Sequence, residues 1–139
     1  MSDPERLPVA ADFAPPPSGA DRLRWDAADR AARPARLARL RARMAAAGVD
    51  AYLGLRPEHS RYLTGLVLGD GEEKVAGYSG WFVVGADDLI VFADSRYTIQ
   101  VGREAPEARI EPVYGDLRQR WPEIAAGLGR DASRSRPAT

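Results

Sequence analysis

Four acidic side chains are the residues of this sequence that come nearest, by type and spacing, to a reaction centre. Asp50 and Asp94 each fall at an end of a predicted strand, and Asp70 and Glu72 lie in a polar loop between them. Carboxylates gathered in this way could hold two magnesium ions, as they do in metal-dependent nucleases. Aspartate also commonly caps turns and helices, and this structural role is the one that we favour for Asp50 and Asp94.

Other catalytic groups are scarce. The sequence has no cysteine, which excludes disulfides, thiol catalysis and thiolate metal sites. His59 is its single histidine, and a lone histidine needs carboxylate partners to bind a metal, so we expect it to cap or hydrogen-bond a helix end. Neither the HExxH nor the GxSxG spacing occurs. The residues alone therefore indicate a small α/β domain with no visible active site.

Charge and composition exclude several classes of partner. Lysine plus arginine equals aspartate plus glutamate at 20 each, so no overall field favours nucleic acid or an anionic membrane. Nearly all cations are arginines, which we interpret as a solvated surface; an anion-binding surface is the alternative. The start of the chain lacks the apolar core of a signal peptide, and no run approaches the ~20 apolar residues of a membrane span. We expect a cytoplasmic protein.

The predicted centre of the fold is a hairpin of two apolar strands, Trp81 to Val84 and Leu89 to Ala93. Both runs are rich in the β-branched and aromatic residues that favour strands. The connection, Gly85 to Asp88, has the glycine and aspartates that tight turns need. Because neither run alternates cleanly with polar residues, we expect helices on both faces of the sheet.

Flanking segments supply those helices and two further strands. Helices are predicted from apolar spacing and end signals at residues 34–47 and 57–64, and from Asp94 or Ser95 to residue 105. Strands are predicted at residues 49–53 and 109–114. The first of these strands is expected to be buried, whereas Pro112 places the second at a sheet edge or gives it a bulge.

The two ends of the chain differ from this central part. Asp116 opens a last helix that either kinks at Pro122 or begins there. Residues 1–31 are rich in proline and alanine and predict a flexible arm, in which Trp25 is the exception. We therefore expect a domain at residues 32–129 and a disordered tail at 130–139.

Four short motifs follow one another in a fixed order, namely AGVDAYL at 47–53, SRYLTG at 60–65, YSGWFVV at 78–84 and FADSRYT at 92–98. In this order they resemble the N-terminal domain of the creatinase, prolidase and aminopeptidase P family, and within it the bacterial Xaa-Pro aminopeptidases. The resemblance runs from about residue 34 to residue 128. Ser95 departs from the glycine that is usual at that place in the family.

The resemblance implies a ribonuclease-H-like α/β fold with three layers, in which helices cover both faces of a mixed sheet. It also implies that the complete enzyme has a C-terminal domain that holds two metal ions, usually manganese or cobalt, and cleaves the bond before a penultimate proline. The ligand motifs of that domain are absent from this sequence, so we expect no catalytic residue and no cofactor in this chain. A polar tail stands where the family continues with a strand, which predicts a fragment with an unpaired sheet edge.

The resemblance further implies a supporting role at the rim of a substrate site. Arg61 and Tyr62, with His59 behind them, are the candidates, because an arginine can hold a carboxylate or carbonyl and a tyrosine can pack on a peptide. The structural alternative places Tyr62 in the core and Arg61 in a surface ion pair.

A second motif and the expected partners complete the implied picture. Asp94, Arg96 and Tyr97 are expected to form a buried cap and ion pair that hold a helix on the sheet. The implied partner is a catalytic metallopeptidase domain or a same-family subunit in a homo-oligomer, with no nucleic acid and no membrane. The alternative is a stand-alone protein-interaction or regulatory module, which would use its exposed edge or its arginine-rich helix.

Overall fold

A four-stranded sheet forms the centre of the computed structural model, which describes residues 15–69 and 77–128. The strands, in their order across the sheet, are β1 (Ala51–Gly54), β2 (Phe82–Gly85), β3 (Leu89–Ala93) and β4 (Arg109–Pro112). The first three pair antiparallel, whereas β4 pairs parallel to β3. The mixed sheet that was predicted is confirmed, as is the edge position of the strand that contains Pro112.

The predicted hairpin is the best buried part of the molecule. β2 and β3 pair with Phe82 opposite Val91, and Gly85 N–H donates to the Asp88 carbonyl across the turn at 3.0 Å. Side chains of these two strands alternate between two separate apolar clusters. Phe82 and Val91 belong to one cluster, and Phe92 belongs to the other. Both faces of the sheet are therefore covered, as the unbroken apolar runs predicted.

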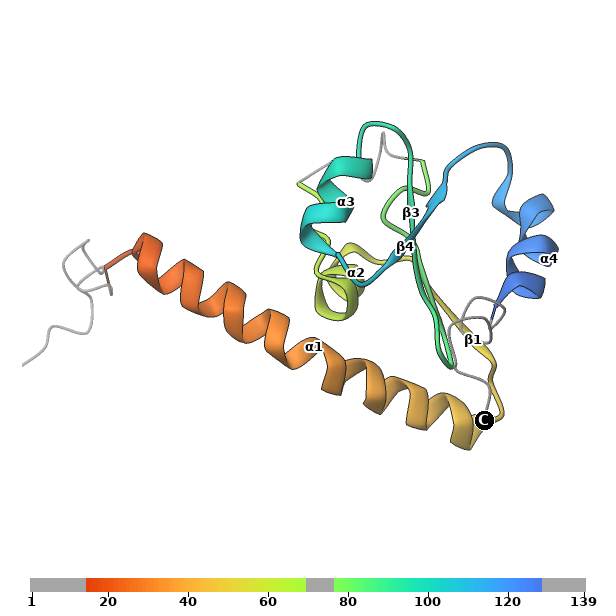
Figure 1. Cartoon of the computed structure of the whole chain (residues 1–139), viewed down its shortest axis with the longest axis horizontal. Coiled ribbons are helices and arrows are strands. Elements are labelled where there is room, and N and C mark those ends of the chain that lie inside the picture. Colours follow the sequence, from red (N-terminus) through yellow and green to blue (C-terminus); the bar gives the residue numbers. More distant parts are fainter. Residues whose placement is uncertain (1–14, 70–76, 129–139) are drawn as a thin grey trace, which may run out of the picture.

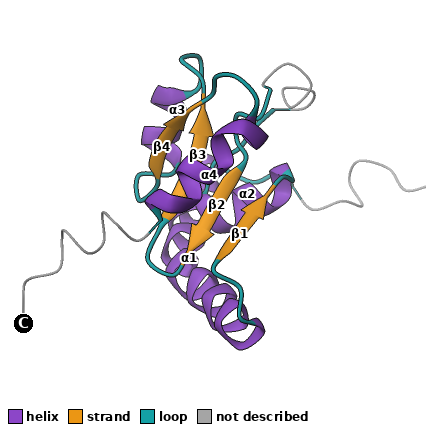
Figure 2. Cartoon of the chain, turned by 90° about the vertical axis from the view of Figure 1, so that its right-hand side faces the viewer, coloured by secondary structure: helices purple, strands orange, loops and turns teal. Residues whose placement is uncertain are grey.

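Four helices of the described part supply that cover: α1 (Gly19–Ala47), α2 (Pro57–Thr64), α3 (Thr98–Glu104) and α4 (Leu117–Gly127). The first three lie on one face of the sheet, where Met44, Leu63 and Val101 join the same apolar cluster. Helix α4 covers the other face through Leu117 and Ile124. Figures 1 and 2 show the sheet between these two layers.

Helix α1 begins fifteen residues before the predicted start, at Gly19 and not at Pro34. Ser18 and Asp21 form a capping box, in which each side chain accepts a hydrogen bond from the other residue's backbone N–H at 3.1 Å. The alanines and arginines that follow are good helix formers, so the helix runs through Pro34 despite its missing N–H. The predicted flexible arm is thus wrong from Gly19 onward; residues 1–14 lie outside the described residues.

The first half of α1 extends away from the rest of the chain (Figure 1). Leu23 is 72% exposed and Trp25 is 59% exposed. The first half of α1 has no apolar face. Its helical structure therefore could not be predicted from the spacing of apolar residues. No helix of the described residues is long and apolar enough to cross a membrane.

Two other boundaries also move. β1 begins at Ala51 and not at Val49. The prediction that this strand is buried is wrong at Leu53, which is 38% exposed, because β1 lies at an edge of the sheet. Helix α3 begins at Thr98, later than Asp94 or Ser95. Helix α4 contains Pro122 in its interior, so it does not begin there. Its N-cap is Asp116, as predicted.

Candidate functional site

The carboxylate pair proposed for metal binding does not assemble. Asp50 directly precedes β1, whose residue Ala51 lies opposite Gly85 near the hairpin turn. Asp94 directly follows β3, whose start pairs with that same end of β2. The two carboxylates therefore lie at opposite ends of the sheet, roughly 20 Å apart along the strands. Asp70 and Glu72 lie outside the described residues, and no group of three potential metal ligands occurs within them.

Helix α2 positions all three candidates for a substrate rim. Pro57 fits its first turn and Gly65 caps its C-terminus with a φ of 92°. Ser60, Leu63 and Thr64 are the residues that the helix buries.

The remaining side chains of α2 point outward. His59 and Arg61 are exposed, and Tyr62 is 49% exposed. The structural alternative that placed Tyr62 in the core is wrong, because the helix directs Leu63 inward in its stead.

Two hollows lie on opposite flanks of α2 and separate these candidates. The first, called here the arginine pocket, measures about 450 Å³, and its lining includes Trp25, Asp29, Arg30, Arg33, Arg61 and Arg103. The second, called the tyrosine pocket, measures about 350 Å³ and is lined by Arg39, Leu40, Arg43, Tyr52, His59, Tyr62 and Leu63. Arg61 thus belongs to one hollow, whereas His59 and Tyr62 belong to the other.

Arg33 ties the arginine pocket to the fold. Its Nη1 donates to the Thr64 carbonyl at 3.2 Å and to the Glu104 carbonyl at 3.1 Å, which are the last residues of α2 and α3. These carbonyls have no partner within their own helices, so one guanidinium satisfies both C-terminal ends. A Cβ at Gly65 would stand 2.2 Å from Arg33 Cζ, so the guanidinium fits only because residue 65 is glycine.

Asp29 holds this arginine and the next one along the helix. Its carboxylate accepts from Arg33 Nε at 3.3 Å and from Arg36 Nη1 at 2.6 Å. Partial burial by itself would raise the pKa of Asp29, but the hydrogen bonds from Arg36 and Arg33 outweigh it and hold that pKa below its usual range. Asp29 therefore stays ionised at neutral pH and keeps both guanidiniums in place.

The tyrosine pocket is built around the Tyr62 ring. Arg36 lies over that ring with its Cζ 4.3 Å from the centroid and donates to the Tyr62 carbonyl at 3.0 Å. Arg39 Nη2 lies 3.4 Å from the Tyr62 hydroxyl. Tyr52 forms part of the wall and contacts Phe82 of the core at a centroid separation of 6.1 Å. The phenol is therefore held in place by α1 rather than free to rotate.

The motif of Asp94, Arg96 and Tyr97 forms a turn before α3. Asp94 Oδ1 accepts from the Arg96 backbone N–H at 2.9 Å, and Asp94 Oδ2 accepts from Arg96 Nη2 at 2.8 Å. The hydrogen bond from Arg96 holds the pKa of Asp94 below its usual range. Tyr97 is buried, as expected, but the ion pair is on the surface, with the Arg96 side chain 57% exposed. The expected buried cap is thus wrong for the charged pair.

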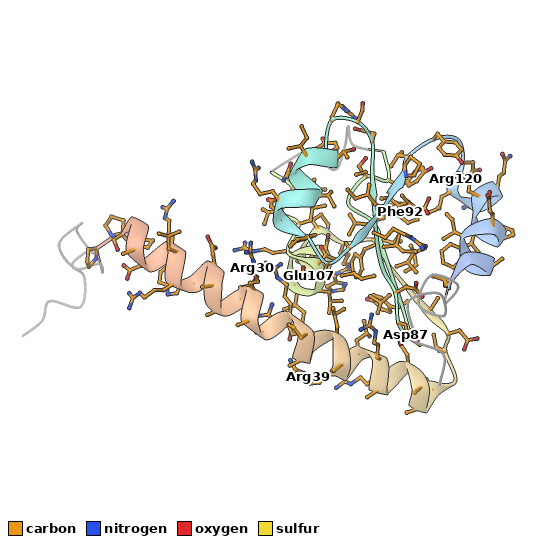
Figure 3. All side chains as sticks on the ribbon, in the orientation of Figure 1. Arg30, Arg39, Asp87, Phe92, Glu107 and Arg120 are labelled. Atoms are coloured by element: carbon orange, nitrogen blue, oxygen red, sulfur yellow. The ribbon has the colours of Figure 1, made fainter. Side chains whose placement is uncertain are left out.

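Several residues that shape these sites were missed by sequence reasoning. Arg33, Arg36, Arg39 and Arg43 are spaced by three, three and four residues, which places them along one side of a helix. That spacing is a signal that the sequence carried. Arg120, labelled in Figure 3, donates to the Pro112 carbonyl at 2.6 Å and to the Tyr78 hydroxyl at 2.8 Å, joining α4 to β4. Nothing local in the sequence pairs Tyr78 with Arg120.

Solved structures similar to this chain include those of three bacterial peptidases or peptidase domains. The aminopeptidase P from Streptococcus thermophilus matches with a TM-score of 0.54 and 21% identity over 68% of this chain and 67% of that one. The N-terminal domain of the cytoplasmic peptidase PepQ from Mycobacterium tuberculosis matches with a TM-score of 0.50 and 28% identity over 70% and 67%. The Xaa-Pro dipeptidase from Bacillus anthracis matches with a TM-score of 0.53 and 20% identity over 67% of this chain.

The share of each relative that is covered differs. This chain spans only 24% of the Bacillus anthracis dipeptidase, and no curated protein sequence matches it. The model of the creatinase/prolidase N-terminal domain matches residues 36–136, which is most of the chain and includes both strands of the hairpin and all of α2. The chain therefore belongs to the creatinase/prolidase N-terminal domain family.

Proposed function

We propose that this chain is the non-catalytic N-terminal domain of an Xaa-Pro-aminopeptidase-like metallopeptidase, and that it supports oligomer contacts and the rim of a substrate site. The family match and the resemblance to the N-terminal domain of a Mycobacterium tuberculosis peptidase support the proposal. With it we propose the ribonuclease-H-like topology that the family resemblance implies; the mixed sheet between two helical layers is compatible with it.

One observation carries the supporting role, namely the outward face of α2. His59, Arg61 and Tyr62 are all exposed on this helix, with Arg61 in the hollow on one flank and His59 and Tyr62 in the hollow on the other. Exposed arginine and tyrosine side chains are the residues that most often anchor contacts with another chain. The described residues offer no group of three metal ligands, so manganese or a similar ion would be held by a separate catalytic domain.

The same proposal includes a cellular location and a binding partner. A similar protein is described as a cytoplasmic peptidase, which supports a cytoplasmic location for this chain. Its partner would be a catalytic metallopeptidase domain or a same-family subunit in a homo-oligomer. Sedimentation velocity tests the oligomer: concentration-dependent association supports it, and a monomer at the highest soluble concentration contradicts it.

An activity assay tests the non-catalytic half of the proposal. The purified chain is incubated with manganese and a peptide whose second residue is proline, and release of the first residue is followed by mass spectrometry. We expect no release above the rate without protein. Release that scales with protein concentration and is abolished by a chelator would contradict the proposal.

A stand-alone binding or regulatory module is the second candidate. The observation that favours it is the exposed edge strand β1, in which Leu53 is 38% exposed. The coding sequence after Thr139 distinguishes the two. Metal-ligand motifs of the types HxxG and ExG in that sequence favour the peptidase domain, whereas an unrelated gene favours the module.

A further inference from the structure

Among the described residues that line the tyrosine pocket, two are arginines and none is acidic. Arg39 and Arg43 come from α1, and the other lining residues are His59, two tyrosines and two leucines. The arginine pocket differs, because three acidic residues, Asp26, Asp29 and Glu104, share its lining with its arginines. The two arginines of the tyrosine pocket thus lack the acidic neighbours that the arginines of the other pocket have.

Neither arginine of the tyrosine pocket is used to hold the fold together. Within the described residues, Arg43 makes no side-chain hydrogen bond or ion pair, and Arg39 makes one long contact of 3.4 Å with the Tyr62 hydroxyl. The two lie four residues apart on one helix, a spacing at which like charges destabilise a helix slightly. Residues 31–49 hold five arginines and no acid, so no acidic residue of α1 lies within two helical turns of Arg39 or Arg43.

The walls of the pocket are already in place for a ligand. Arg36 lies over the Tyr62 ring, and the pocket-lining Leu63 is buried. A fixed phenol can donate a hydrogen bond to an anion without losing side-chain entropy on binding. Arg39, which is labelled in Figure 3, then adds a planar guanidinium beside that phenol.

Size and spacing favour carboxylates on a peptide over a polyanion. A cavity of about 350 Å³ admits side chains, and the chain as a whole has equal numbers of cations and anions, so no overall field favours nucleic acid. Arginines one helical turn apart have Cβ atoms about 5–6 Å apart. Side chains on one face of an extended peptide recur at roughly 6.6 Å, so alternating acidic residues match that spacing.

We propose that the tyrosine pocket, through Arg39, Arg43 and Tyr62, binds an acidic segment of a partner chain in which carboxylates alternate with other residues. The inference rests on the proposed supporting role of α2 and names the chemistry of the partner that this helix contacts. Peptidase activity of the isolated chain would contradict the proposed function and leave the binding measurement below unaffected, so the two can fail separately.

Isothermal titration of the full chain tests the proposal. The probe is a five-residue peptide in which glutamate alternates with serine, and its control has glutamine in place of glutamate. We expect saturable binding of the first peptide at low salt and none of the second. Absence of saturable binding overturns the proposal, and so does citrate or a single-stranded DNA oligonucleotide that binds at least as tightly, because the ligand would then be a free anion or a nucleic acid.

Matched variants separate a defined pocket from diffuse attraction. The double variant Arg39→Gln with Arg43→Gln is expected to bind the glutamate peptide about tenfold more weakly or worse, and Tyr62→Phe about two- to fivefold more weakly. The control, Arg22→Gln with Arg118→Gln, removes the same charge from exposed positions on α1 and α4 and is expected to leave the affinity within about twofold. Equal weakening in the control overturns the proposal. Thermal unfolding of each variant confirms that it is folded.

Discussion

The two pockets beside α2 use the same residue type in opposite ways. In the arginine pocket, Arg33 is 11% exposed and binds one carboxylate and two helix-terminal carbonyls. In the tyrosine pocket, Arg39 and Arg43 are exposed and hold no helix end or carboxylate of the described chain. Arginine content by itself therefore does not identify a binding surface. A binding surface is indicated where the guanidiniums have few partners within the fold.

The largest expected effect is that of removing Arg33. Arg33→Ala removes the donor that the Thr64 and Glu104 carbonyls share and leaves the Asp29 carboxylate with Arg36 alone, so we expect a loss of about 2–4 kcal/mol in the free energy of unfolding. Arg43→Ala is the control on the other pocket, with an expected change within about 0.5 kcal/mol. Urea unfolding followed by circular dichroism measures both. Equal losses in the two variants would remove the distinction between the pockets.

A substitution at Gly65 tests whether Arg33 needs the space beside this glycine. Gly65→Ala is expected to cost about 1–3 kcal/mol, because φ is 92° and the added Cβ would meet the Arg33 guanidinium. Gly102→Ala is its control within α3, where a Cβ has no atom within 4 Å, and it is expected to stabilise by about 0.5–1 kcal/mol. The melting temperatures of the two variants should therefore move in opposite directions. A stabilised Gly65→Ala variant would show that Arg33 does not need this space.

A pair of tyrosines extends the comparison to hydroxyl groups. The Tyr78 hydroxyl contacts the Tyr114 carbonyl at 2.8 Å, the Tyr114 N–H at 3.0 Å and Arg120 Nη1 at 2.8 Å. Tyr78→Phe is expected to lower the free energy of unfolding by about 1–2 kcal/mol, and Tyr62→Phe by less than about 0.5 kcal/mol. Denaturant unfolding measures both changes. A larger loss at Tyr62 would assign its hydroxyl a structural role.

The smallest expected effect is a pH dependence that belongs to Asp29. Because its folded pKa is lowered, the unfolded chain binds more protons, and the contribution of Asp29 is present above the unfolded pKa of about 3.9 and lost as pH falls through the folded value. Asp29→Asn should therefore flatten the fall in stability below about pH 4. Unfolding curves recorded between neutral and acidic pH measure this slope. An unchanged slope in the variant would show that the ion pairs of Asp29 do not persist in solution.

The sequence predicted the parts of the fold that depend on local patterns. The β2–β3 hairpin followed from two apolar runs and a Gly–Asp turn, and α2 followed from Pro57 and Gly65. The first half of α1 did not, since it has no apolar face and its start depends on the hydrogen bonds between Ser18 and Asp21. Apolar periodicity reports burial, so it is silent about a helix that extends into solvent.

The candidate site could be predicted only in part, for a related reason. The motif around Arg61 and Tyr62 directed attention to α2, but the sequence did not show that α2 has two flanks with different arginines beside them. Contacts such as Arg36 with Tyr62 join residues that are 26 positions apart. The proposed pairing of Asp50 with Asp94 failed because strand ends were counted without the strand directions.

Urea unfolding of the double variant Arg39→Gln with Arg43→Gln measures whether these two arginines serve binding and not the fold. We expect a free energy of unfolding equal to that of the natural chain or slightly above it, since a pair of like charges is removed from α1. A loss of more than about 1 kcal/mol would show that the two arginines hold the fold together, and it would contradict the assignment of the tyrosine pocket as a binding surface.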